Sequence, residues 1–296
     1  MQKNNLQLIV NKSINLFKSK NKLKKIKDFY KARIVKKYQI RTLKQLLPEK
    51  LQAETKQNSI EFYKSKSLKV ENLKISNSQS IMVYFYYYNF LFYLYNEIFM
   101  NDAYKFKSEN KNPFIIDCGG NIGIATLYFK CLYPKSEILV FEPSSENFNL
   151  LKKNIDANSL NNITCIQKAL HNKKTTMTLN GTGTVMGSFI INYDNIETEK
   201  IETDLLSNYI TKEIDLLKID IEGSECNVIE DLAINKKLKF IKQIILEYHH
   251  MPEILNKNNL SQILHLLKSN NFKCEIKDSA YFTHMTIIII QAYNEN

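Results

Sequence analysis

The chain has 296 residues and a formal net charge of +11, with the 44% hydrophobic and 24% charged content of an ordinary soluble globular protein. The charge is uneven, because residues 1–110 carry a net +14 and residues 111–296 a net −3. Only two arginines, Arg33 and Arg41, occur. Since base and phosphate recognition relies on arginine, we do not expect nucleic-acid binding. A basic strip on an anionic membrane, or a solvated basic helix, fits better.

The five cysteines stand singly, without metal-ligand spacing, and their odd number argues against a disulfide framework. Buried free thiols suit a reducing compartment, so we expect a cytoplasmic protein. A peripheral position at the membrane surface is compatible with this expectation. The first residues lack a clear signal-peptide core and cleavage site.

Residues 1–80 are predicted to form a basic, mainly helical N-terminal extension. Apolar residues recur at helical spacing through residues 16–35, and no glycine or proline precedes Pro48. Both a solvated extension and a surface that docks on a membrane or partner fit this pattern. Within it, Leu68–Ile75 fits a short strand.

The segment Ile81–Met100 is rich in aromatic residues, and we expect a buried or half-buried helix there, as part of a lead-in over residues 81–112. A helix at the membrane interface and a membrane span are the alternatives. Six tyrosines, two asparagines and Glu97 argue against the span, because such groups are unfavourable at bilayer depth.

From residue 113 to 296, apolar strand patterns alternate with helical patterns. We predict strands at 114–117, 137–143, 163–170, 214–223, 241–250, 272–277 and 283–293, and helices at 122–132, 144–160, 225–232 and 260–270. This alternation predicts an α/β domain whose mostly parallel sheet has helices on both faces and ends in an antiparallel edge. A hairpin of 175–180 with 187–193 would surround Asn180–Ser188, as a substrate gate or a plain turn.

The turn after the first of these strands reads D-x-G-x-N-x-G and holds Asp117, Gly119, Gly120, Asn121 and Gly123. A dinucleotide site would have G-x-G-x-x-G here, and a carboxylate at its mouth would repel a pyrophosphate. We expect Asp117 to favour a cationic cofactor such as S-adenosylmethionine. The methionine carboxylate of that cofactor suits a helix N-terminus, and the glycines permit close backbone approach.

Glu142 ends the second strand, and an acid there can accept hydrogen bonds from both hydroxyls of a ribose. A capping role at the following helix is the alternative. Together, Asp117 and Glu142 indicate an adenosyl site.

The densest set of ionisable groups follows the fourth and fifth predicted strands: Lys218, Asp220, Glu222, Glu225, Glu247 and His249. Neighbouring carboxylates raise one another's pKa, so one of them could act as a general base. Asp220 and Glu222 could instead hold a divalent cation, and His249 could itself be the base. In the alternative without catalysis, Lys218 pairs with Asp220 or Glu222 and holds the turn.

Three blocks, "IIDCGGNIGIATLYF", "VFEPSSENFNLLKKNI" and "IDLLKIDIEGSE", resemble the signature blocks of the FkbM-type methyltransferase family. The resemblance extends over about Ile98 to Tyr293, with Gly120 where the family often has alanine. It implies a class I, seven-stranded Rossmann-like methyltransferase that uses S-adenosylmethionine. It also implies a methyltransferase catalytic domain over residues 113–296 and O-methylation of a sugar, glycan or other small molecule.

The resemblance also implies roles for single residues. Asp117, Gly119, Asn121 and Gly123 would line the methionine end of the cofactor, Glu142 would bind the ribose and Ala169 would lie near the adenine. Tyr104 would close over the cofactor or serve in packing. Methylation of a protein, lipid or RNA, and a non-catalytic cofactor-binding module, are the other functions that we consider. The oligomeric state and any need for a metal cannot be read from these patterns.

Overall fold

The structure is a computed structural model that describes residues 67–76, 79–180, 198–250, 259–281 and 286–295. The basic helices predicted within residues 1–47 lie outside the described residues. So do the predicted strand at 187–193 and the loop that precedes it.

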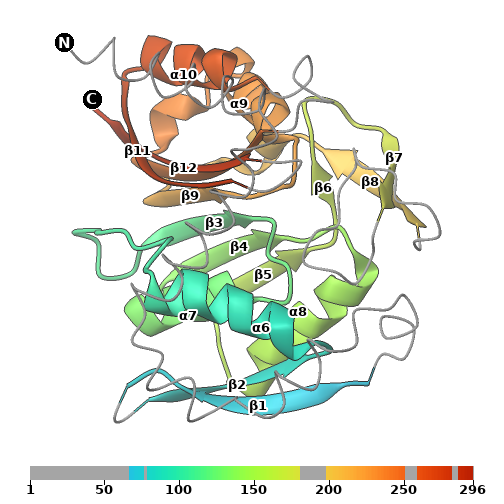
Figure 1. The fold of residues 1–296 in the computed structure, drawn as a ribbon. Helices are drawn as coiled ribbons and strands as arrows, with labels where there is room; N and C mark the ends of the chain where they lie inside the picture. The colour runs from blue at the N-terminus through green and yellow to red at the C-terminus, as the bar shows by residue number, and fades with distance from the viewer. Residues whose placement is uncertain (1–66, 77–78, 181–197, 251–258, 282–285, 296) are drawn as a thin grey trace, which may run out of the picture. The chain divides into compact units, whose positions relative to one another are not determined.

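A seven-stranded sheet forms the centre of this part of the chain (Figure 1). Its strands, in spatial order, are β11 (Phe272–Tyr281), β12 (Thr286–Asn294), β10 (Gln243–His250), β9 (Leu216–Ile219), β3 (Phe114–Cys118), β4 (Glu137–Phe141) and β5 (Ile163–Ile166). β12 runs antiparallel to both neighbours, and the remaining pairs are parallel. The predicted mostly parallel sheet with an antiparallel edge is therefore confirmed.

Helices cover both faces of this sheet (Figure 1). Helices α7 (Ile124–Leu132) and α8 (Ser145–Ala157) lie on one side, and α9 (Glu225–Ile234) and α10 (Leu260–Ser269) on the other. The chain moves outward from β3 to β5 and then returns to β9, beside β3. The boundary between β3 and β9 is thus the switch point of the sheet, where ligands of open α/β sheets bind at the carboxyl ends of the strands.

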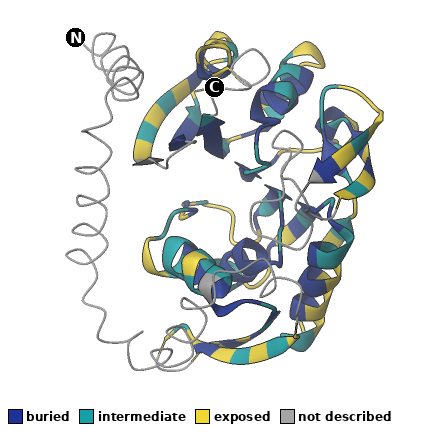
Figure 2. Ribbon diagram, turned by 45° about the vertical axis from the view of Figure 1, so that its right-hand side comes forward, coloured by how far each residue is buried: buried dark blue, intermediate teal, exposed yellow. Residues whose placement is uncertain are grey.

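Burial explains the continuous apolar runs of the central strands. Ile115 and Ile116 of β3, and Leu216 and Leu217 of β9, are fully buried. Figure 2 shows buried residues in the sheet and on the helix faces turned toward it. A strand covered on both faces cannot alternate apolar with polar residues, and this is why its pattern was readable.

The structure has a second sheet, of three strands, that the sequence did not predict. The predicted strand 163–170 is divided into β5 and β6 (Ala169–Leu170). Strand β6 pairs with β8 (Thr198–Asp204), which also pairs with β7 (Thr176–Asn180). Strand β8 was not predicted, because four of its seven residues are charged and Ile201 is its one apolar residue. Two short 3₁₀ turns, η2 (Leu206–Tyr209) and η3 (Leu238–Phe240), complete this half of the chain.

The aromatic lead-in is only partly helical. Strands β1 (Lys69–Lys74) and β2 (Ser80–Phe85) form a hairpin, followed by α6 (Tyr88–Tyr95) and a π-helical turn, η1 (Asn96–Met100). The strand predicted at Leu68–Ile75 is confirmed, whereas the helix predicted from Ile81 begins only at Tyr88. Residues 81–85 alternate in burial and pair with β1, so strand pairing overrides their apolar run.

Asn154 of α8 and Asn158, the residue directly after α8, attach this hairpin to the sheet domain. Asn154 exchanges side-chain hydrogen bonds with the backbone of Tyr84, and Asn158 does so with Met82. Among the described residues, no helix has the length and apolar character needed to cross a membrane.

Candidate active site

The glycine turn after β3 brings the ends of three strands into contact. The N–H groups of Gly119 and Gly120 both donate to the carbonyl of Phe141 at the end of β4, at 3.0 and 2.8 Å. Gly119 has a φ of 87°, and a side chain there would overlap the carbonyl oxygen of Asp220 after β9. A glycine is therefore required where β3 and β9 meet.

The sequence predicted the Asp117 carboxylate at the mouth of this turn, but the structure places it elsewhere. Its carboxylate is fully buried, with Oδ2 accepting a hydrogen bond from Thr126 at 2.9 Å and Oδ1 lying 3.2 Å from the Lys218 ammonium. Burial raises the pKa of Asp117, and Lys218 opposes that shift. The cation that Asp117 binds is thus the Lys218 ammonium of the chain itself. Because Lys218 also donates to the carbonyl of Gly119, the Asp117 carboxylate stabilises the turn through this lysine.

Lys218 holds the turn and a neighbouring carboxylate together. Its ammonium donates to the carbonyl oxygen of Gly119 at 2.7 Å and lies 3.4 Å from Asp220 Oδ2. The predicted pairing with Asp220 is thus present, whereas the buried partner is Asp117. The buried ammonium of Lys218 is thus bound by two carboxylates and a backbone carbonyl, and its catalytic role stays a prediction.

Glu142 follows β4 and is buried beside the turn. Its carboxylate accepts the N–H of Asn121 at 2.8 Å and the N–H of Ser144 at 2.9 Å. Burial raises the pKa of Glu142 to about 7, although both backbone bonds oppose the shift. Each oxygen has a further lone pair, so the carboxylate is still able to accept hydroxyl groups of a ligand. Capping is shared with Ser144, whose hydroxyl accepts from the N–H of Asn147.

Ala169 is a buried residue of β6. Its methyl group packs in a small apolar cluster with Leu179 and Ile201, between β6, β7 and β8. The side chain is therefore committed to the core of the three-stranded sheet, so any contact with an adenine would have to come from the backbone.

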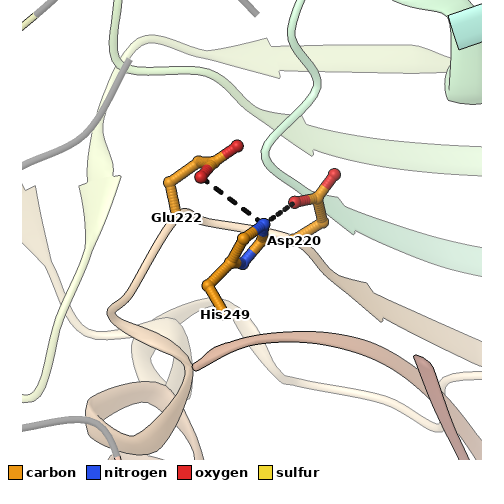
Figure 3. A group of neighbouring side chains, drawn as sticks. All are labelled: Asp220, Glu222 and His249. Carbon is orange, nitrogen blue, oxygen red and sulfur yellow. Dashed lines mark ion pairs between the residues drawn. The ribbon is translucent and has the colours of Figure 1, made fainter. Parts of the chain in front are cut away.

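Four of the predicted catalytic side chains come together at the carboxyl ends of β9 and β10. We call Asp220, Glu222, Glu247 and His249 the acidic group. Figure 3 shows His249 between two of its carboxylates. The Nε2 atom lies 3.4 Å from Glu222 Oε2, 3.8 Å from Asp220 Oδ1 and 3.7 Å from Glu247 Oε1. Strand β9 ends at Ile219, so a turn, rather than strand alternation, places Asp220 and Glu222.

The other nitrogen of His249 is held by a residue at the start of α9. Nδ1 lies 2.9 Å from Glu225 Oε1, and the same oxygen accepts the N–H of Gly223. Burial alone would lower the pKa of His249, but the carboxylates of Glu222 and Glu225 raise it well above its usual range. Burial raises the pKa of Glu222 to about 8, and His249 opposes that shift.

Tyr104 contacts two members of the acidic group through its hydroxyl. Its buried hydroxyl lies 2.9 Å from Glu247 Oε2 and 3.1 Å from Asp220 Oδ2, so one proton is shared between two carboxylates. Its ring lies beside the Lys218 ammonium. Burial, Asp220 and Glu97 together raise the pKa of Glu247 well above its usual range.

Glu97 is a member of this neighbourhood that the sequence did not reveal as a candidate. It lies in η1, and burial together with the nearby Asp220 raises its pKa to about 7. The signal in the sequence was a single acidic residue within a strongly aromatic segment. That residue argued against a membrane span, but it did not by itself indicate a functional site. A π-helical turn is itself frequent at functional sites.

The strand order, the glycine turn at the switch point and the acid after β4 define a class I, Rossmann-like methyltransferase fold. The model of the methyltransferase FkbM domain matches residues 117–274, more than half of the chain. The protein therefore belongs to the FkbM methyltransferase family, as the three blocks had indicated.

Two curated proteins and one solved structure are among those similar to this chain. Methyltransferase 1 of Beauveria bassiana is 30% identical over 165 residues, which cover 47% of this chain and 66% of that protein. Methyltransferase sdnD of Sordaria araneosa is 25% identical over 192 residues, covering 52% and 73%. An FkbM methyltransferase structure from Methylobacillus flagellatus KT has a TM-score of 0.45 and 14% identity, covering 66% and 47%. The chain thus spans slightly less than two thirds of the first relative and about half of that structure.

Proposed function

We propose that this protein is an S-adenosylmethionine-dependent methyltransferase that acts on a hydroxyl group of a sugar, glycan precursor or other small molecule. The observation that carries the proposal is that the FkbM match includes both the glycine turn after β3 and the acidic group after β9 and β10. One segment thus contains a candidate cofactor site and a candidate site for proton removal.

The residues around the turn fit the cofactor. Glu142 would accept the ribose hydroxyls with its remaining lone pairs. The first turn of α7, which begins after Gly123, would bind the methionine carboxylate through its N–H groups. The negative charge suited to the ammonium and sulfonium would come from Asp220 and its neighbours, because the carboxylate of Asp117 is fully buried whereas that of Asp220 is partly exposed. When bound, S-adenosylmethionine supplies a methyl group that an acceptor oxygen takes up by in-line displacement.

A hydroxyl acceptor must lose its proton during the transfer, and this requirement favours O-methylation at this site. Glu222 follows β9, and burial raises its pKa to about 8, close to neutral pH. Groups that titrate near neutral pH are effective proton acceptors. Asp220 and Glu222 are also partly exposed, with side-chain exposures of 24% and 21%, so an acceptor can reach them.

We also propose, from the sequence alone, that the basic N-terminal residues bring a cytoplasmic enzyme to anionic membranes. The net +14 of residues 1–110 supports this. Sedimentation of the full chain with vesicles containing phosphatidylserine should exceed that with neutral vesicles. Equal sedimentation with both would refute the membrane proposal.

The experiment for the main proposal has two arms. Calorimetry with S-adenosylhomocysteine tests the cofactor, and incubation with labelled S-adenosylmethionine and separate glycan, lipid, protein and RNA fractions tests the acceptor. We expect binding, and label transferred to a glycan or small-molecule fraction. Absence of binding would refute the cofactor assignment. Binding with label only in protein, lipid or RNA would move the acceptor to that class, and binding without any transfer would favour a non-catalytic module.

A further inference from the structure

Three members of the acidic group form a mixed set of potential metal ligands. One ligand atom each from Asp220, Glu222 and His249 lies within 4.8 Å of the others. The set joins two carboxylate oxygens to an imidazole nitrogen, a combination that suits Zn²⁺ or Mn²⁺ better than Ca²⁺, which takes six to eight oxygens. Figure 3 shows the three side chains converging from the turn after β9 and from β10.

The distances distinguish the two nitrogens of His249. Nδ1 lies 2.9 Å from Glu225, which is a hydrogen-bonding distance. Nε2 lies 3.4 and 3.8 Å from the carboxylates of Glu222 and Asp220, longer than the 2.7–2.9 Å typical of a charge-assisted hydrogen bond. Two ligands bound to one ion at about 2.0–2.2 Å are separated by roughly 3.0–3.6 Å. The spacing at Nε2 is therefore nearer to that of ligands around a shared ion.

Glu225 provides the support that metal-binding histidines commonly have. Its carboxylate is fully buried, and with Nδ1 as the hydrogen-bond donor the lone pair of Nε2 points toward the carboxylates. The same oxygen accepts the N–H of Gly223. Glu222 and Gly223 both adopt positive φ angles, 53° and 110°, so this turn holds Glu222 in an unusual backbone conformation beside the histidine.

The charge around the set also favours a cation. Glu247 adds a third carboxyl group to those of Asp220 and Glu222, with its Oε1 atom 3.7 Å from His249 Nε2. The nearby Lys218 already lies between Asp117 and Asp220. A divalent ion would offset the repulsion among these carboxyl groups.

We propose that Asp220, Glu222 and His249 bind one divalent transition-metal ion, with Glu225 orienting His249. The role of that ion rests on the proposed function: it would bind the acceptor hydroxyl and lower its pKa, so that a neighbouring carboxylate can take the proton. The binding itself does not depend on that role. The competing arrangement is a protonated His249 that occupies the position of the ion.

Manganese binding tests this directly. The full chain, treated with chelator and dialysed, is titrated with Mn²⁺ and free Mn²⁺ is measured by electron paramagnetic resonance, with Zn²⁺ as competitor. We expect one bound Mn²⁺ per chain that Zn²⁺ displaces. Glu222→Gln and His249→Ala should each weaken binding by about tenfold or more, and Glu225→Gln by about ten- to a hundredfold. His265→Ala, at an exposed position of α10, should leave it unchanged.

The outcomes separate this proposal from the cofactor assignment. No Mn²⁺ binding by the folded wild-type chain, or binding unaffected by Glu222→Gln, would refute the metal site. Circular dichroism verifies that each variant is folded. If His249→Ala does not fold, the Mn²⁺ affinity of Glu222→Gln is the deciding measurement. Calorimetry with S-adenosylhomocysteine on the same preparation tests the cofactor assignment separately. A chain that binds S-adenosylhomocysteine but not Mn²⁺ would refute the metal site and leave the cofactor assignment intact.

Discussion

The ammonium group of Lys218 lies 3.2 Å from a carboxylate oxygen of Asp117, and both side chains are buried between β3 and β9. Burial alone would lower the pKa of Lys218, but Asp117 and Asp220 raise it above its usual range, so the lysine stays charged. Through Gly119 the pair supports the turn, and through Asp220 it reaches the acidic group. It thus joins the candidate cofactor site to the candidate acceptor site.

Replacing Lys218 should be strongly destabilising. Lys218→Met leaves the Asp117 carboxylate buried without its partner, and we expect a loss of about 3–5 kcal/mol in the free energy of unfolding. The double variant Lys218→Met/Asp117→Asn should recover part of this loss. Urea denaturation followed by circular dichroism measures it, since the chain has no tryptophan. Lys242→Met, which removes a half-exposed lysine, is the control and should change stability by less than about 1 kcal/mol.

The two neighbouring glycines of the turn should respond differently to alanine. Gly119→Ala forces a positive φ and overlaps the backbone of Asp220, so we expect a loss of at least about 2 kcal/mol. Gly120→Ala overlaps a methyl group of the buried Val140, but no backbone atom and without a positive φ, so the loss should be smaller, about 1 kcal/mol. Thermal unfolding of the two variants compares them. Equal midpoints would show that the turn does not need Gly119.

Glu142→Ala should weaken binding of S-adenosylhomocysteine by about 1–3 kcal/mol, roughly 5- to 150-fold, because a carboxylate acceptor for the ribose is lost. Calorimetry measures the change. Glu137→Ala, at the exposed start of the same strand, is the matched control and should bind as the wild type does. Unchanged affinity in Glu142→Ala would place the ribose elsewhere.

Stability should fall as the pH rises through the range in which Glu142 titrates. Its folded pKa is about 7 and its unfolded pKa about 4.3, so the folded chain holds an extra proton between these values. Ionising the buried carboxyl therefore removes up to about 3 kcal/mol of stability between about pH 4 and 7. Urea midpoints across this range should slope less in Glu142→Gln than in the wild type. Parallel slopes would mean that burial does not raise this pKa.

Tyr104→Phe should lower the rate of methyl transfer by about tenfold or more, because Asp220 and Glu247 lose their shared hydrogen bond. Binding of S-adenosylhomocysteine should stay nearly unchanged, since the ring remains beside Lys218. Tyr133→Phe, which alters only a hydrogen bond to the backbone of Ser108, is the control for the loss of a tyrosine hydroxyl. A loss of cofactor affinity in Tyr104→Phe would instead favour a lid over the cofactor.

The sequence could predict features that depend on residues near one another along the chain. The apolar runs of β3 and β9 marked buried strands because both sheet faces are covered, and the glycines after Asp117 marked the turn. The sequence could not predict β8, because its mostly charged residues give no apolar run. It also could not predict the start of α6, because pairing with β1 makes residues 81–85 a strand.

The sequence by itself thus determined the sheet, the family and the gathering of acids at two neighbouring strand ends, because hydrophobic periodicity and short motifs are local signals. Only the tertiary structure decided what those acids face. Asp117 turned inward to Lys218, Tyr104 came to bridge Asp220 and Glu247, and Glu225 came to hold His249. These pairs join residues far apart in the chain, and burial selects them because a charge removed from water must find a partner.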